Sequence, residues 1–142
     1  MMMACISLSD LTEISQASFA ELEALGKELD PRAEESSRVF GKSIAAVEAI
    51  LKVAYKMAVI AAKRAETLEQ EAQAWQIMGE IADSVIRILE SLKDKFPRCG
   101  TRELYDLALD YKLAADKRFA LTNEAIECQT IPMPEGLFPR MT

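Results

Sequence analysis

The sequence predicts an all-α protein, and three features support this fold class. Half of the 142 residues are apolar but only 6% are aromatic, and just 5 glycines and 5 prolines are present to form turns. No proline occurs between Pro31 and Pro97, and apolar residues in that stretch recur at three- and four-residue steps. This period is typical of amphipathic helices. We therefore predict an antiparallel four-helix bundle in residues 1–129, followed by a proline-containing apolar tail in residues 130–142.

The first helix is expected to run from Leu8 to Leu29. Ser7 or Ser9 can cap its start, and Asp10 adds a negative charge in the first turn, where the helix dipole favours it. Apolar residues at helical spacing define the face that should be buried. These residues are Leu8, Leu11, Ile14, Leu22, Leu25 and Leu29.

The second helix is expected to begin at Asp30-Pro31. Asp30 can accept a hydrogen bond from a free backbone N–H group at the helix start. Pro31 suits the first helical position because an N–H group there has no partner within the helix.

A long seam of apolar and small residues follows, with the alternating spacing of a heptad pattern. Its members are Ile44, Val47, Leu51, Ala54, Ala58, Ala61, Ala65, Leu68, Ala72, Trp75, Gly79, Ala82, Ile86 and Leu89. The segment between Arg64 and Leu68 allows two interpretations. Thr67 and Gln70 can form a capping box that starts a new helix after a turn, which completes the four-helix bundle. Alternatively, one long helix spans about residues 31–96, with a flanking helix at each end, and the protein is a dimer.

The last helix is expected from Thr101, as its cap, to about Cys128. The Pro97–Gly100 segment separates it from the preceding helix, since proline and glycine both disfavour helix interiors. The tail after it contains five large apolar residues and three prolines, so we expect residues 131–141 to dock onto the bundle or a partner.

Charge and cysteine content limit the partners and the compartment. The net charge of −6 makes a nucleic-acid partner improbable, because phosphate backbones are bound through clustered Lys and Arg. The most hydrophobic stretch, residues 43–62, is interrupted by Glu48, Lys52 and Lys56, so no membrane span is expected. The three cysteines are widely spaced and odd in number, which indicates a reducing cytoplasm.

The sequence contains no histidine at all. Nucleophile–histidine catalytic systems, ExxH di-iron bundles and HExxH zinc sites are thereby excluded. An all-carboxylate Mg²⁺ site needs several acidic residues from neighbouring helices at one point. A solvated acidic face is much more common, so we expect no metal, no cofactor and no enzymatic activity.

These observations predict a non-enzymatic protein-interaction module, such as an adaptor, chaperone, inhibitor or immunity-type protein. We expect a protein partner, with a second copy of the chain as one such partner. The residues predicted to mediate interaction are Ala54, Met57, Ala58, Ile60, Ala61, Leu137 and Phe138. The alternative is a small-molecule sensor or Mg-dependent helical enzyme, with a pocket that uses carboxylates and Tyr55, Tyr105 and Tyr111. A filled core with an exposed apolar strip would favour the first function, and acidic residues converging at a buried point the second.

Overall fold

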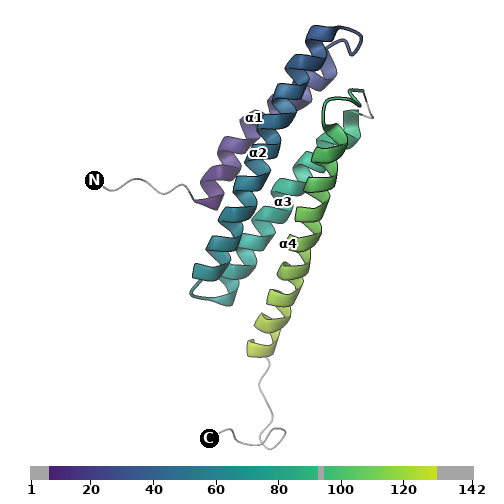
Figure 1. Cartoon of the computed structure of the whole chain (residues 1–142). Coiled ribbons are helices and arrows are strands. Elements are labelled where there is room, and N and C mark those ends of the chain that lie inside the picture. Colours follow the sequence, from purple (N-terminus) through teal and green to yellow (C-terminus); the bar gives the residue numbers. More distant parts are fainter. Residues whose placement is uncertain (1–6, 93–94, 131–142) are drawn as a thin grey trace, which may run out of the picture.

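Four helices make up 88% of the residues that the computed structural model describes, which are residues 7–92 and 95–130. Their bounds are Leu8–Glu28 for α1, Glu34–Arg64 for α2, Leu68–Leu92 for α3 and Thr101–Thr130 for α4. The described part of the chain contains no strand. Successive helices run antiparallel (Figure 1), so the predicted all-α four-helix bundle is confirmed.

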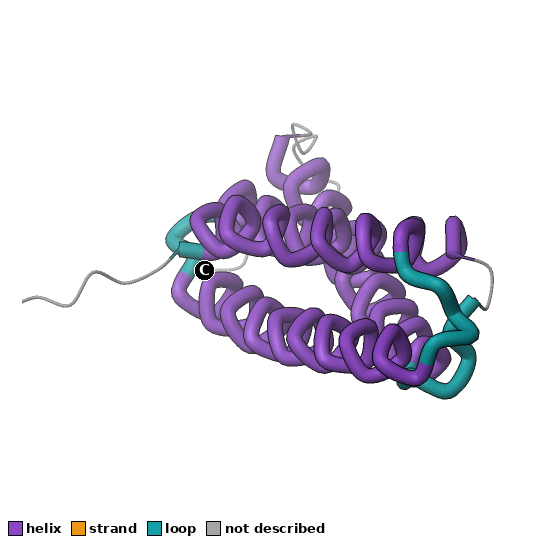
Figure 2. Tube along the Cα trace, turned by 90° about the horizontal axis from the view of Figure 1, so that it is seen from above, coloured by secondary structure: helices purple, strands orange, loops and turns teal. Residues whose placement is uncertain are grey.

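The four helices do not pack as an evenly closed ring. Both α2 and α3 contact each of the other helices, whereas α1 and α4 form no contact with each other among the described residues. The α1–α2 and α3–α4 connections lie at one end of the bundle, and the α2–α3 connection lies at the other (Figures 1 and 2). We call the end with the α1–α2 and α3–α4 connections the closed end, and the end with the α2–α3 connection the open end.

A turn separates α2 from α3, which is the first of the two interpretations made from the sequence. The Thr67 hydroxyl accepts a hydrogen bond from the N–H of Gln70 at 3.2 Å, as predicted. The reciprocal bond differs from a standard capping box, because the Gln70 side chain accepts from the N–H of Glu66, at 2.9 Å. The one long helix does not form, since α2 ends at Arg64 and α3 begins at Leu68.

The other helix starts confirm one prediction and correct two. Ser7 caps α1 through a complete capping box with Asp10. In contrast, α2 begins at Glu34 rather than at Pro31. The Asp30 carboxylate accepts from the N–H of Arg32 at 3.0 Å, and this local turn takes the place of a helix cap.

The start of α4 is also different from the prediction. Thr101 is its first residue, but the Thr101 hydroxyl donates to the carbonyl of Phe96 at 2.8 Å instead of capping the helix. Gly100 precedes it with φ of +83°, a conformation that glycine adopts without the steric cost of a Cβ atom. The helix continues to Thr130, two residues beyond the expected end at Cys128.

The core at the closed end contains large side chains from three helices. Phe40 stacks on Phe96 with ring centroids 4.3 Å apart, and Leu22 and Leu104 are fully buried. Gly26 lets α1 approach α3 closely, because an added Cβ would lie only 2.5 Å from a methyl carbon of Leu92. The packing of the core at the closed end therefore depends on the close contact between α1 and α3.

The buried face of α1 agrees with the prediction except at Ile14. Ile14 is 54% exposed, whereas Ser15 and Phe19 are buried. Ser15 is tolerated there because its hydroxyl donates to the carbonyl of Leu11, which leaves no unpaired polar atom. A small residue at this position also allows neighbouring helices to approach.

Candidate functional site

The described residues offer no metal centre and no membrane span. No group of three or more Cys, Asp or Glu side chains comes together as metal ligands in residues 7–92 and 95–130. Within the same ranges, no helix combines the length and the apolar character needed to cross a membrane.

The predicted interaction residues occupy different environments in the bundle. Ala54 and Ala58 are 0% exposed, so a partner cannot touch them while the bundle stays folded. Met57 and Ala61 are half-buried against the core, and Ile60 is 48% exposed. Leu137 and Phe138 lie outside the described residues, as does the rest of the tail.

Helix length explains why part of α2 stays uncovered. α1 has 21 residues and α2 has 31, so α2 extends about 15 Å past the start of α1 at 1.5 Å per residue. Figure 1 shows α1 beginning part-way along α2, on the side towards the open end. The last turns of α2 therefore have no α1 on the flank that α1 covers elsewhere.

Apolar residues gather on this flank. Ser18, Glu21 and Leu25 of α1 line a shallow groove with Lys42 and Ala46 of α2, which shows which sides of the two helices face each other. On each helix, residues at steps of three or four along the same face continue from this groove towards the open end. The residues so reached are Ile14 on α1, and Ala49, Val53, Met57 and Ile60 on α2.

We call Ile14, Val53, Met57 and Ile60 the outer strip. Ile14, Val53 and Ile60 are 54%, 48% and 48% exposed, and they are three of the five large apolar side chains exposed among the described residues. The other two, on α4, do not lie on this flank. Contiguous exposed apolar residues on a soluble domain often mark a binding surface, while single ones need no explanation.

Opposite charges flank the outer strip on its two helices. The exposed acidic residues beside it on α1 are Asp10, Glu21 and Glu28, and the exposed basic residues on α2 are Lys42, Lys56 and Arg64. The α1 edge of this face is therefore negative, and the α2 edge is mainly positive, with Glu35 as an acidic exception.

A second feature is a cleft of about 500 Å³ between α2, α3 and α4 near the open end. Its walls contain apolar, basic and acidic side chains from all three helices. They are Val59, Ala62, Lys63, Glu71, Trp75, Arg118, Leu121 and Thr122. This volume falls in the range of small-molecule sites.

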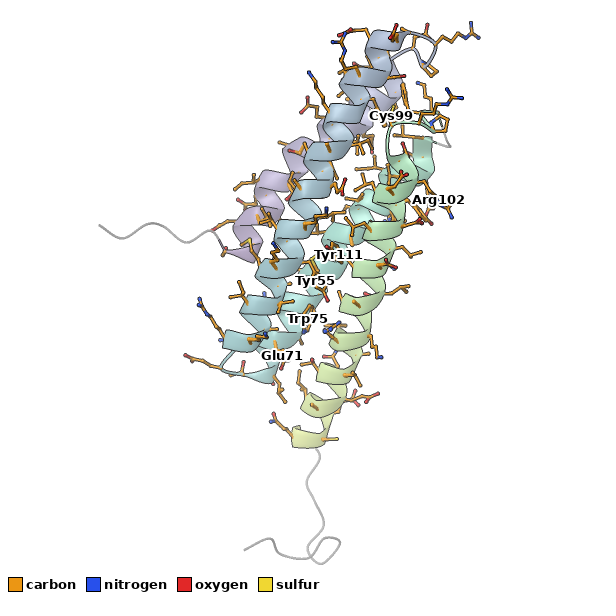
Figure 3. The ribbon with its side chains drawn as sticks, viewed as in Figure 1. Tyr55, Glu71, Trp75, Cys99, Arg102 and Tyr111 are labelled. Atoms are coloured by element: carbon orange, nitrogen blue, oxygen red, sulfur yellow. The ribbon has the colours of Figure 1, made fainter. Side chains whose placement is uncertain are left out.

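Aromatic side chains continue from the cleft into the bundle. Tyr55 lies 6.2 Å from Trp75 and stacks on Tyr111 at 4.5 Å between ring centroids. Figure 3 shows the three side chains as a row between α2, α3 and α4, with Glu71 near the open end. Burial raises the pKa of Tyr111, and Tyr55 and Glu48 raise it further against the opposing effect of Lys52. Tyr105, the third predicted pocket tyrosine, forms no ring contact with another described aromatic residue.

Ion pairs with other described residues do not neutralise the charges of the cleft. Lys63, Glu71 and Arg118 form no ion pair with another described residue. The guanidinium of Arg118 lies 5.1 Å from the centroid of the Trp75 ring, which is a cation–π geometry. A second, smaller cleft lies between α3 and α4. Its charges differ from those of the first cleft, because Asp83 there pairs with both Arg87 and Lys112.

Neither the cleft nor its charges were predicted from the sequence. Trp75 was expected in the core, and it is indeed only 5% exposed. The available signal was the spacing of α4, in which Arg118 follows Tyr111 and Ala114 on the apolar face, where an apolar residue would be expected. Arg118 at this position is exposed to solvent, yet its guanidinium still contacts the buried Trp75 ring.

Comparison with known proteins adds no assignment, since no family model, no curated protein and no solved structure matches this chain.

Proposed function

We propose that the chain is a non-enzymatic protein-interaction module that pairs with a second copy of itself through the outer strip. The observation that carries this proposal is the exposure of Ile14, Val53 and Ile60, which helical spacing places on one flank of the α1–α2 pair. The described acidic residues do not converge at a buried point, which is what the enzyme alternative requires. Adaptors and inhibitors commonly act through such surfaces.

Charge complementarity supports a second copy as the occupant. A two-fold axis between the copies and parallel to the helices brings α1 of each copy opposite α2 of the other. The acidic edge, with Glu21, then meets the basic edge, with Lys42, on both sides of a shared apolar centre. Such isologous pairing is the commonest symmetry of soluble oligomers.

We also assign the module to a reducing compartment, the cytoplasm. Cys99 and Cys128 are both free thiols among the described residues. The acidic net charge of −6 argues against nucleic acid and anionic membrane surfaces as partners.

Size exclusion with light scattering at micromolar concentrations tests the proposal. We expect the wild-type chain to be dimeric and the double variant Val53→Asp, Ile60→Asp to be monomeric with its helix content unchanged. Burying two carboxylates in an apolar interface should raise the dimer dissociation constant by at least about a hundredfold. Leu113→Asp is the matched control, because Leu113 is 58% exposed but lies on α4, away from the strip.

Two results would overturn the proposal. One is a wild-type chain that stays monomeric at these concentrations, and the other is a dimer that the strip variant leaves intact. Increasing salt should weaken the dimer, because the edge charges are exposed and therefore screened. A dimer that strengthens with salt would contradict the charge pairing while leaving the apolar contact in place.

A further inference from the structure

We infer that the cleft between α2, α3 and α4 binds a small amphipathic carboxylic acid, with Arg118 and Lys63 holding the carboxylate and the apolar walls of the cleft contacting its apolar body. This goes beyond the proposed function, since the cleft is lined by the α4-facing side of α2 and the outer strip lies on the α1-facing side. The two proposals can therefore fail independently.

The first argument is the balance of charge in the cleft. Lys63 and Arg118 contribute two positive charges and Glu71 one negative charge, in a chain whose net charge is −6. None of the three is neutralised by an ion pair in the described part of the protein. An anionic group bound between Lys63 and Arg118 could accept hydrogen bonds from side-chain N–H groups that form no ion pair with a described carboxylate.

The second argument is the shape and polarity of the walls. Val59, Ala62 and Leu121 form apolar walls, and Trp75 lies under the Arg118 guanidinium with only 5% of its surface exposed. Apolar walls beside a few charged groups are typical of small-molecule recognition. The apolar part of a ligand would bury against these walls, while the carboxylate stays near the charged rim.

The third argument is that Arg118 is already oriented. Its guanidinium lies over the Trp75 ring, and one of its nitrogens donates to the carbonyl of Ala114 at 3.3 Å. A planar guanidinium held in place loses less side-chain entropy when it binds a carboxylate, and its remaining N–H groups can bind both oxygens.

Glu71 determines which acids fit. It lies in the first turn of α3, where the helix dipole stabilises its negative charge. Glu71 can accept a hydrogen bond from a hydroxyl, amide or ammonium group of the ligand, but it repels a second carboxylate. We therefore expect monocarboxylates to bind more tightly than dicarboxylates of the same size.

Trp75 makes the test direct, because it is the sole tryptophan of the chain. The probes are 4-phenylbutyrate, 4-phenylbutylamine and acetate, none of which absorbs where tryptophan is excited selectively. We expect 4-phenylbutyrate to change the Trp75 fluorescence saturably at millimolar concentrations. The amine should bind at least about tenfold more weakly, because it replaces an attraction to the two cations with a repulsion. Acetate should have no effect, because it lacks the apolar body.

Variants locate the binding. Arg118→Gln should weaken 4-phenylbutyrate binding by about tenfold or more, and Lys63→Gln should weaken it less. Arg102→Gln is the control, since Arg102 lies on α4 near the closed end, far from Trp75 (Figure 3). Calorimetric titration should accompany fluorescence, because removing the cation from Trp75 also changes its emission. The inference is overturned if 4-phenylbutyrate does not bind, if the amine binds equally well, or if Arg118→Gln and Arg102→Gln bind alike.

Discussion

The closed and open ends of the bundle differ in how completely their helices cover one another. At the closed end, Phe40 and Phe96 stack, and the ammonium of Lys95 donates to the carbonyls of Gly26 and Lys27 at 2.7 and 3.2 Å. These two bonds satisfy carbonyl groups at the end of α1 that have no partner within the helix. At the open end, α1 is absent beside the last turns of α2. The surface there contains the outer strip on one flank and the Trp75 cleft on the other.

This difference suggests a division of roles within one chain. Dense packing at the closed end fixes the relative positions of α1, α2 and α3. The open end keeps apolar and charged side chains accessible because fewer helices compete for them. Both proposed binding surfaces depend on this incomplete cover.

Two matched valines on α2 test the comparison with the largest expected effect. Val47 is 0% exposed, in the part of α2 that α1 covers, whereas half-buried Val59 lines the cleft. Val47→Ala should lower the free energy of unfolding by about 2–3 kcal/mol, because it leaves a cavity that neighbours cannot fill. Val59→Ala should cost less than about 1 kcal/mol, since its methyl groups already face open space. Urea denaturation followed by circular dichroism measures both, and equal losses would refute the distinction between the ends.

Two glycines provide a sharper test of the α1–α3 contact. A Cβ at Gly26 would lie 2.5 Å from a Leu92 methyl carbon, whereas nothing lies within 4 Å of a Cβ at Gly41. Gly41→Ala should raise the free energy of unfolding by about 0.5–1 kcal/mol through better helix propensity. Gly26→Ala should lower it by about 1 kcal/mol, because the shift of Leu92 outweighs the same gain in propensity. Thermal unfolding of the two variants would contradict the close approach if both were stabilised.

Much of the fold could be predicted from spacing because it depends on local sequence. The apolar period gave the helices, and Ser7 and Thr67 marked two of their starts correctly. The predicted helix starts were wrong where a polar side chain could form a hydrogen bond with more than one nearby backbone group. Asp30 forms a turn with Arg32 instead of capping α2, and Thr101 bonds back to Phe96.

The surfaces were harder to predict because they depend on relations between helices. The Ala54–Ala61 region was expected to be an interaction surface mainly if the helix continued through residue 66. The turn instead folds α3 back over it, so that Ala54 and Ala58 are buried and the exposed residues are Val53 and Ile60. The cleft likewise arises because α2 and α4 make only limited contact, a feature that no single helix encodes.

The smallest effect is expected from a change of pH, which acts on the capping box at the start of α1. The backbone N–H and hydroxyl of Ser7 lower the pKa of Asp10 below its ordinary value of 3.8. A carboxyl whose pKa is depressed by folding contributes stability above the unfolded pKa, and this contribution is lost as pH falls through the folded value. Asp10→Asn should therefore lower the melting temperature slightly at pH 7, with the difference from wild type shrinking as pH falls below about 4.

Glu13→Gln is the matched control for this measurement. It also removes one exposed negative charge from α1, but Glu13 takes no part in the capping box. If Glu13→Gln shows the same pH-dependent difference, the effect comes from net charge and not from the cap. If only Asp10→Asn shows it, the capping box stabilises the one end of α1 that lies beside the uncovered turns of α2. The outer strip begins at Ile14, in the next turn, so fraying of this helix end should also weaken the proposed dimer.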